Sequence, residues 1–398
     1  MPASLTTASN ILKIVYEDRI REQINSRVKL LKYCEKSSTG VVSGKYVDIA
    51  LHVTRNSGVG ARRERENLPS AGQQGYAEER IGLKYLYGRI EVSGPSIKLS
   101  DTNTNSFARV LEQETTRIKD DLAVDLNRQC YGNGTGALGT TSSSTSITTP
   151  VITSGIQNFQ EGMVVDVYTS ANFASEGASK ATATVTAVGT STITLSAAVA
   201  FAAGDVFVRT GNINREITGL GAIVNDTGTL YNVDPVSFPI WKSTVNANSG
   251  VNRVLGESMM ITMADAIVAK GSNPSHIFTS LGVRRAYFNL LEQQREFTNS
   301  GGTPGGFGGG FTGLSFATDD GAIPVISDKD CPPNTMYFLD TTHLKVYQDA
   351  DWGWLDMTGS KWQQVPNQDA YSATLQRYME LATDRRNAFG VIRDITEA

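Results

Sequence analysis

The sequence has few of the residues from which metal sites and disulfide frameworks are built. Its 398 residues include only 3 Cys and 3 His. The cysteines, Cys34, Cys130 and Cys331, lack the close spacing of a thiolate zinc site or a disulfide scaffold. The scattered histidines argue against a multi-histidine site. We therefore expect no bound metal.

Long apolar runs and an excess of positive charge are also missing. No stretch approaches the roughly 18 apolar residues of a membrane helix, and the polar N-terminus lacks the core of a secretory signal. We therefore expect no membrane partner and assembly in a cytoplasm. The chain has 36 Lys+Arg against 40 Asp+Glu, a formal net charge of -4, which excludes a chain-wide basic surface for nucleic acid.

Motifs for catalysis and cofactor binding are absent or out of context. Gly308, Gly310 and Gly313 match G-x-G-x-x-G, but a helix is expected before them and a strand after them, the reverse of a dinucleotide site. There is no phosphate-binding loop, zinc-protease motif or nucleophile elbow. The sequence therefore predicts a protein that is not an enzyme, with no catalytic, cofactor-binding or metal-binding residues.

The most regular pattern predicts one long helix over residues 104–131. Apolar residues recur at steps of four and seven, which is typical of a helix with one buried face. They are Phe107, Leu111, Ile118, Leu122 and Leu126. Gly132, Asn133 and Gly134 follow and should end the helix. At ~1.5 Å per residue it would be about 40 Å long.

A long polar segment, 54–82, separates two alternating stretches, 45–53 and 83–93, that read as strands. It has little to bury within itself, so we expect an extended two-stranded ribbon stabilised by another chain; a solvated loop is the alternative. Its mixed charges suit ion pairing with a neighbouring subunit. The candidate inter-subunit contact residues are Arg55, Arg62, Arg63, Glu64, Arg65, Glu66, Glu78, Glu79 and Arg80.

The remaining chain contains two further kinds of pattern. Residues 139–210 are rich in Ser, Thr, Ala and Val and contain short alternating runs, which predict a small antiparallel β domain. From residue 211, helices are expected at 252–270 and 281–297, with a buried strand at 276–280 between them. Helices and strands follow no regular βαβ rhythm, so the predicted fold class is α+β.

Four stretches, taken in order, resemble the major capsid proteins of tailed phages that have the Hong Kong 97-type fold. Residues 84–100 are similar to the strand that leads out of that family's extended loop. Residues 107–139 resemble its spine helix and the segment at the end of that helix, which here reads NRQCYGNGTG. Residues 323–352 resemble later strands of the axial domain, and 378–395 resemble closing strands of the peripheral domain.

The resemblance implies how the chain is divided. The expected parts are an N-terminal arm, 1–45; peripheral-domain strands, 46–100, with the extended loop 54–82; the spine helix, 101–138; an inserted β-rich domain, 139–210; a mainly axial domain, 211–375; and closing strands of the peripheral domain, 376–398.

The resemblance also implies the function. The chain would be a major capsid protein that self-assembles through pentamers and hexamers into an icosahedral head shell. The shell would enclose double-stranded DNA without sequence-specific binding. The protein would be assembled in the host bacterial cytoplasm, reside in the virion, and have portal, scaffolding and decoration proteins as further partners. Some relatives form isopeptide bonds through a lysine of the extended loop; here no Lys lies between Lys45 and Lys84, so we expect non-covalent contacts.

Two alternatives remain open at this point. An encapsulin-type nanocompartment shell shares the fold but holds protein cargo. A β-rich phage tail protein or adhesin would explain the Ser/Thr-rich segment 139–210 and would form trimers or tubes. The shape and contents of the particles distinguish the three possibilities.

Overall fold

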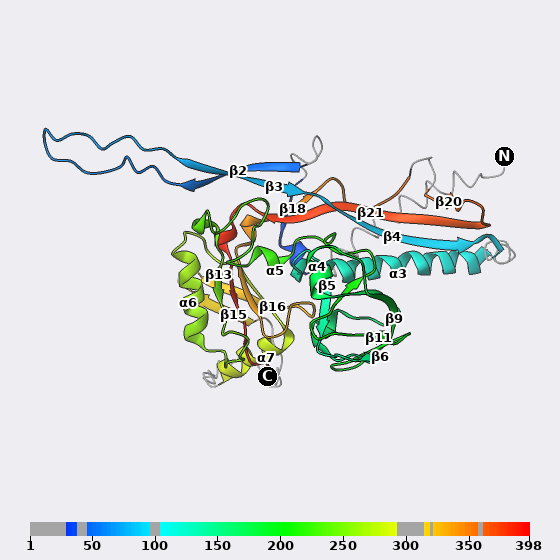
Figure 1. The fold of residues 1–398 in the computed structure, drawn as a ribbon. Coiled ribbons are helices and arrows are strands. Elements are labelled where there is room, and N and C mark those ends of the chain that lie inside the picture. Colours follow the sequence, from blue (N-terminus) through cyan, green and yellow to red (C-terminus); the bar gives the residue numbers. More distant parts are fainter. Residues whose placement is uncertain (1–28, 38–45, 96–103, 293–313, 319–320, 357–360) are drawn as a thin grey trace, which may run out of the picture. The chain divides into compact units, whose positions relative to one another are not determined.

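The structure is a computed structural model that describes the chain outside residues 1–28, 38–45, 96–103, 293–313, 319–320 and 357–360. The chain forms two compact units (Figure 1). The first contains residues 82–219 and 346–381 together with the N-terminal stretch up to residue 45, and the second contains residues 46–81, 220–345 and 382–398. Most of the expected N-terminal arm and the Gly308–Gly313 motif lie outside the described residues.

The first unit is built on two long antiparallel strands. β4 (Lys84–Ser93) confirms the strand predicted at 83–93, and it pairs with β21 (Ala370–Thr383) without a break from Lys84–Met379 to Ser93–Ala370. The other strands of this sheet are β1 (Glu35–Ser37), β18 (Leu344–Gln348), β19 (Gly353–Trp354) and β20 (Gln363–Gln364).

The long helix packs directly against β4. α3 (Thr104–Tyr131) confirms the helix predicted over 104–131. At Gly88 of β4, a Cβ atom would lie 2.6 Å from Leu122 Cδ1 and 3.1 Å from Ile118 Cδ1. Glycine therefore lets strand and helix approach without displacing these side-chain ends. No helix in the described part of the chain is both long and apolar enough to cross a membrane.

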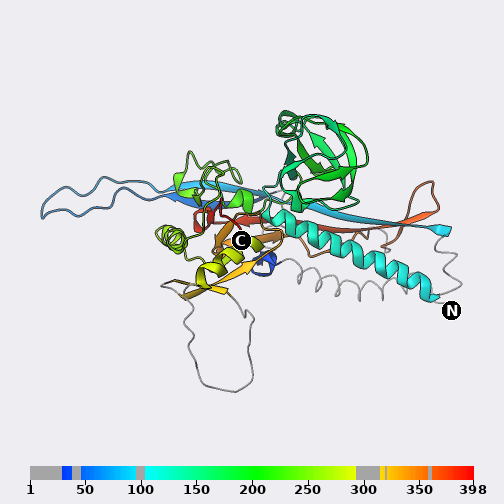
Figure 2. The ribbon, with the colours of Figure 1, turned by 90° about the horizontal axis from the view of Figure 1, so that it is seen from below.

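Residues 137–209 form a six-stranded antiparallel barrel. Its strands, in spatial order, are β10 (Ile193–Leu195), β9 (Ala181–Val188), β8 (Val164–Tyr168), β12 (Val206–Arg209), β5 (Ala137–Thr141) and β7 (Ile152–Ser154). The sheet closes because Ile152 N donates to Ser191 O at 2.8 Å and Leu195 N donates to Thr148 O at 2.8 Å. Figure 2 shows the strands wrapped around a common centre.

The barrel interior is filled by alternate side chains of its strands. Val165, Val167, Val185 and Phe207 are each fully buried, and Phe159 meets Phe207 edge-on at 5.5 Å between ring centroids. The Val- and Thr-rich alternation of the sequence thus supplies an apolar inner face. Three short elements complete the module: β6 (Ser146–Ile147), α4 (Ser170–Ala174) and β11 (Val199–Ala200).

The second unit contains a mixed six-stranded sheet. Its spatial order is β13 (Thr244–Asn246), β22 (Gly390–Ile392), β17 (Met336–Leu339), β14 (His276–Thr279), β16 (Gly321–Ser327) and β15 (Leu314–Thr318). The pairs β13–β22 and β14–β16 are parallel and the others are antiparallel. The unit also contains the two-stranded pair β2 (Tyr46–Thr54) and β3 (Gly75–Gly82), and the short helix α5 (Leu220–Ile223).

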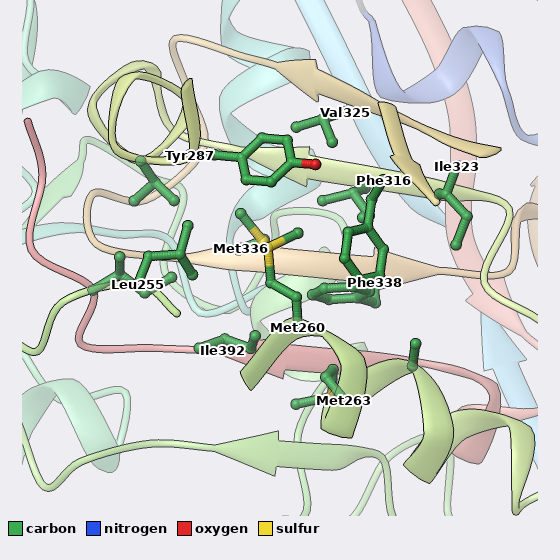
Figure 3. Packing of buried hydrophobic residues seen from close by; sticks show 14 of the residues in the cluster. Leu255, Met260, Met263, Tyr287, Phe316, Ile323, Val325, Met336, Phe338 and Ile392 are labelled. Carbon is green, nitrogen blue, oxygen red and sulfur yellow. The ribbon is translucent and has the colours of Figure 1, made fainter. Parts of the chain in front are cut away.

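Two helices cover this sheet. α6 (Glu257–Val268) and α7 (Leu281–Glu292) contribute Met260, Met263 and Tyr287 to a core that includes Met336 and Phe338 (Figure 3). β14 confirms the strand predicted at 276–280. α6 is shorter than the predicted helix 252–270. It begins after Gly256, because the preceding residues bond as extended chain to the C-terminal segment: Arg253 N donates to Asp394 O at 2.8 Å.

The two units do not follow the expected ranges at the C-terminal end. Residues 346–381 belong to the unit of α3, whereas 211–375 was expected to be mainly axial. Residues 382–398 belong to the other unit, whereas 376–398 was expected to close the peripheral domain. The reason is strand pairing: β21 pairs with β4, but β22 lies between β13 and β17 in the mixed sheet.

A buried arginine joins the C-terminal segment 382–398 to the region around α5 within the second unit. Arg386 is 1% exposed, and its guanidinium donates to the carbonyl oxygens of Ile223, Gly228, Ala222 and Thr227 at 2.9–3.1 Å. These carbonyl groups lie at the end of α5 or after it, where the helix supplies no further N–H donors. Burial lowers the pKa of Arg386 to about 10, so the group remains charged at neutral pH and binds the carbonyls strongly.

We predict that Arg386→Met destabilises the protein by about 3 kcal/mol, because it leaves several buried carbonyl groups without donors. Urea unfolding of the full chain, followed by circular dichroism, measures this loss of stability. Arg284→Met is the control: its exposed side chain makes one bond, to Ser327 Oγ at 3.1 Å, and should cost less than about 1 kcal/mol. Equal losses in both variants would contradict the role of Arg386.

Candidate assembly surfaces

The segment between β2 and β3 continues as two narrow arms that run side by side (Figure 1). Residues 55–74 contain no strand, yet the arms meet closely. A Cβ on Gly72 would lie 2.9 Å from the nitrogen of Gly58 and 2.4 Å from Asn56 Oδ1. Glycine therefore lets the two backbones approach. Beyond Thr54, where β2 ends, only residues 75–82 of the predicted ribbon 54–82 form a strand, β3, which pairs with β2 (Tyr46–Thr54); the ribbon's stabilisation by another chain stays a prediction.

The tip of this loop is a tight turn with charged side chains. Glu66 N donates to Arg63 O at 3.1 Å, and Arg63 N donates to Glu66 Oε2 at 2.8 Å. Arg65 has a φ of 67°, a left-handed conformation that costs a non-glycine residue roughly 1 kcal/mol. Arg55, Arg62, Arg63, Glu64, Arg65 and Glu66 are all exposed. Among the described residues, no carboxylate forms an ion pair with Arg55, Arg63 or Arg65.

Two apolar side chains in the loop are almost fully exposed. Val59 is 87% exposed and Leu68 is 85% exposed, the highest values among the large apolar residues that the structure describes. They are also the only large aliphatic residues between positions 55 and 74. The charge pattern of the segment did not single them out.

The paired strands at the base of the loop have one polar and one apolar face. On the exposed face, Arg80 Nε donates to Asp48 Oδ1 at 2.9 Å and Arg80 Nη2 donates to Glu78 Oε1 at 2.8 Å. The hydrogen bond from Arg80 lowers the pKa of Asp48. Glu78 and Arg80 are therefore exposed, as a contact role requires, but they already pair within the chain.

Glu79 was also a candidate contact residue, and its position does not fit that role. Its side chain is 0% exposed, because alternate residues of β3 face opposite sides and Glu79 shares the buried side with Ile81. It therefore cannot meet a neighbouring subunit while β3 is in this position. The mixed-charge pattern of the sequence did not reveal which face each residue takes.

The segment that follows the barrel is fixed to the end of α3 by buried charges. Arg128 Nη2 lies 3.0 Å from Asp125 Oδ1, and Arg128 Nη1 lies 3.0 Å from Glu216 Oε2. Burial alone would lower the pKa of Arg128, but Asp125 and Glu216 raise it. Asn214 N donates to Thr135 O at 2.9 Å, so the chain enters and leaves the barrel at adjacent points.

A groove lies in the same unit between β4, α3 and the segment that follows β12. Its volume is about 910 Å³, and Ile118, Leu122 and Arg215 are among the lining residues. Among the described strands, β4 pairs only with β21. On the exposed side of this strand pair, Tyr85 and Tyr87 meet Tyr378 edge-on at 5.1 Å and 6.1 Å.

No group of three or more His, Cys, Asp or Glu side chains among the described residues is arranged to hold a metal ion. Cys34, Cys130 and Cys331 are each buried and form no disulfide. Burial raises the pKa of Cys34 to about 12 and raises the pKa of Cys331 as well, so these two thiols are not nucleophiles at neutral pH.

Comparison with known proteins identifies the fold. Residues 77–396 match the family model described as the SU10 major capsid protein. The structure of the cyanophage A-1(L) capsid asymmetric unit aligns with a TM-score of 0.56 and 18% identity over 92% of this chain and 90% of that chain. The capsid of an empty GTA particle aligns at 0.49 with 10% identity, covering 93% and 90%. No curated protein sequence matches the chain.

The similarity to the cyanophage capsid structure shows that the chain has a fold of the Hong Kong 97 type. Because the family model covers most of the chain, the protein belongs to the SU10 major capsid protein family. It is a major capsid protein that forms the icosahedral phage head, a non-catalytic structural component of the virion. Family membership selects this function over the nanocompartment and the adhesin.

We predict that Gly72→Val separates the arms of the loop, because its Cβ would meet backbone at Gly58. Trypsin should then cleave at the exposed arginines several-fold faster, while the folded units keep their stability. Gly60→Val is the control in the same loop: its Cβ would meet only the flexible end of Arg62, at 3.1 Å. Equal cleavage rates in both variants would show that the arms are not held together here.

Proposed function

We propose that each subunit uses the extended loop to hold a neighbouring subunit in the shell. The observation that carries this proposal is the exposure of Val59 and Leu68 in arms that have no core of their own. Isolated apolar residues surrounded by charges resemble a small contact with a polar rim. The contact residues are Val59 and Leu68 with Arg55, Arg62, Arg63, Glu64, Arg65, Glu66, Glu78 and Arg80.

We further propose that the second unit, apart from the loop, is the axial domain that surrounds the centres of pentamers and hexamers, and that the first unit is the peripheral domain. The shell then encloses double-stranded DNA without sequence-specific contacts. A net charge of -4 supports this, because strong binding to DNA requires many cations at its phosphates. Portal, scaffolding and decoration proteins are the proposed further partners.

The barrel is proposed as a module inserted into the capsid fold that decorates the outer surface or braces neighbouring subunits. Its support is the bond between Thr135 and Asn214, which brings the two ends of the segment together. Domains whose ends are adjacent can be inserted into a host fold with little disturbance. The barrel also has its own apolar core, which includes Leu138, Val165 and Phe207.

We predict that the double variant Val59→Ser, Leu68→Ser yields folded subunits that form few or unstable shells. Each truncation removes an apolar contact worth about 1.5–3 kcal/mol when buried. The yield of closed shells is measured by electron microscopy and sedimentation, under conditions in which the unmodified chain assembles. Val236→Ser is the control, since Val236 is 80% exposed outside the loop. Normal shells from the double variant would contradict the proposed contact.

We also predict that joining Gly136 directly to Asn212, without the barrel, leaves the rest of the chain folded. A Cβ on Gly136 would lie 2.7 Å from Asn212 O, so the junction needs little rearrangement. Hydrogen exchange of β4 and α3 should match that of the full chain, and the segment 135–214 should fold when expressed alone. Loss of protection in β4 and α3 would show that the barrel is part of the core fold.

A further inference from the structure

The root of the extended loop contains an unpaired buried carboxyl group. Glu79 lies in β3, the strand that returns from the loop, and its side chain is 0% exposed. Neither Oε1 nor Oε2 has a hydrogen-bond partner among the described residues. Buried polar groups are nearly always paired, and an unpaired one needs an explanation. A buried carboxylate costs far more than a buried carboxylic acid.

The cation next to Glu79 in the chain and the two cations beside Asp384 are committed to other partners. Arg80 points to the opposite, exposed face of β3, where it pairs with Asp48 and Glu78. Lys345 Nζ lies 3.1 Å from Asp384 Oδ2, and His343 Nδ1 lies 2.8 Å from Asp384 Oδ1. Asp384 itself acts on Glu79 as a like charge. Among the described residues, no positive charge acts on Glu79 to lower its pKa.

The burial of Glu79 and the nearby negative charge of Asp384 both favour the neutral carboxylic acid. Burial, and secondly the charge of Asp384, raise the pKa of Glu79 from its ordinary value of 4.5 to about 8. At neutral pH the carboxyl group therefore holds a proton in this position. If β3 moves so that water reaches Glu79, the group regains an ordinary pKa and ionises.

We propose that Glu79 is a proton-dependent anchor of the extended loop: β3 stays packed at the root of the loop while the carboxyl group is neutral, and its ionisation releases the root. This device acts within one chain. It therefore does not depend on which neighbour the tip of the loop contacts in the shell. It would let a change in proton concentration move the loop without altering the charged tip.

The sign of the effect follows from the two pKa values. Below about pH 4.5 the group is protonated in both positions, so packing of β3 is not penalised. As the pH rises from there to about 8, the released position gains by ionising, and the packing equilibrium falls by up to about tenfold per pH unit. Above that range the group is ionised in both positions and the equilibrium stays constant.

Hydrogen exchange of the full-length, unassembled subunit tests the proposal between pH 5 and 9, with rates corrected for intrinsic exchange. We expect the protection of β2 and β3 to fall by up to about tenfold per pH unit up to about pH 8, while β14 remains protected. Glu79→Gln removes the charge and should remove this dependence. Glu91→Gln, which alters an exposed carboxylate of β4 that pairs with Arg89, should retain it.

Three outcomes would overturn the proposal. One is protection of β2 and β3 in the unmodified chain that does not change with pH. Another is a pH dependence that persists in Glu79→Gln, which would assign it to the His343–Asp384 pair. The third is a parallel loss of protection in β14, which would indicate global unfolding. Glu79→Met, a neutral side chain without hydrogen-bonding oxygens, repeats the test if the amide variant does not fold.

Discussion

The unbroken ladder between β4 and β21 is the interaction on which the first unit depends. It joins residue 84 to residue 379 and residue 93 to residue 370, so segments at opposite ends of the chain form one stiff pair. Gly88 allows α3 to lie against this pair. β4 also follows β3 in the chain after a single residue, Leu83. The strand that returns from the loop is therefore followed in the chain, after one residue, by a strand of this ladder.

A shell built from many copies of one chain needs parts that keep their shape and parts that adjust. The core around Met260, Met263 and Phe338 and the interior of the barrel belong to the first kind, because close-packed interiors resist deformation. Residues 55–74 belong to the second kind: they have almost no buried side chain and no strand hydrogen bonds. Ordering such a segment on contact makes assembly cooperative.

Periodicity predicted the elements whose neighbours in sequence are also their neighbours in space. The stripe through Ile118, Leu122 and Leu126 defined α3, and alternation defined β2 and β4. The placement of β22 beside β17 could not be predicted, because a three-residue strand carries no signal about its distant partner. For the candidate site, the cluster of charged residues predicted the exposed tip of the loop. It did not predict the burial of Glu79, which depends on which side chains of β3 face the interior.

The small size of the proposed loop contact is suited to a structure that must form without errors. Burying Val59 and Leu68 contributes about 1.5–3 kcal/mol each, and ion pairs at an exposed rim contribute little more. A single such contact dissociates readily, so a misplaced subunit can leave. In a closed shell every subunit is held by several contacts at once, and their free energies accumulate as in multivalent binding. Weak individual contacts therefore permit correction during growth and still give a durable shell after closure.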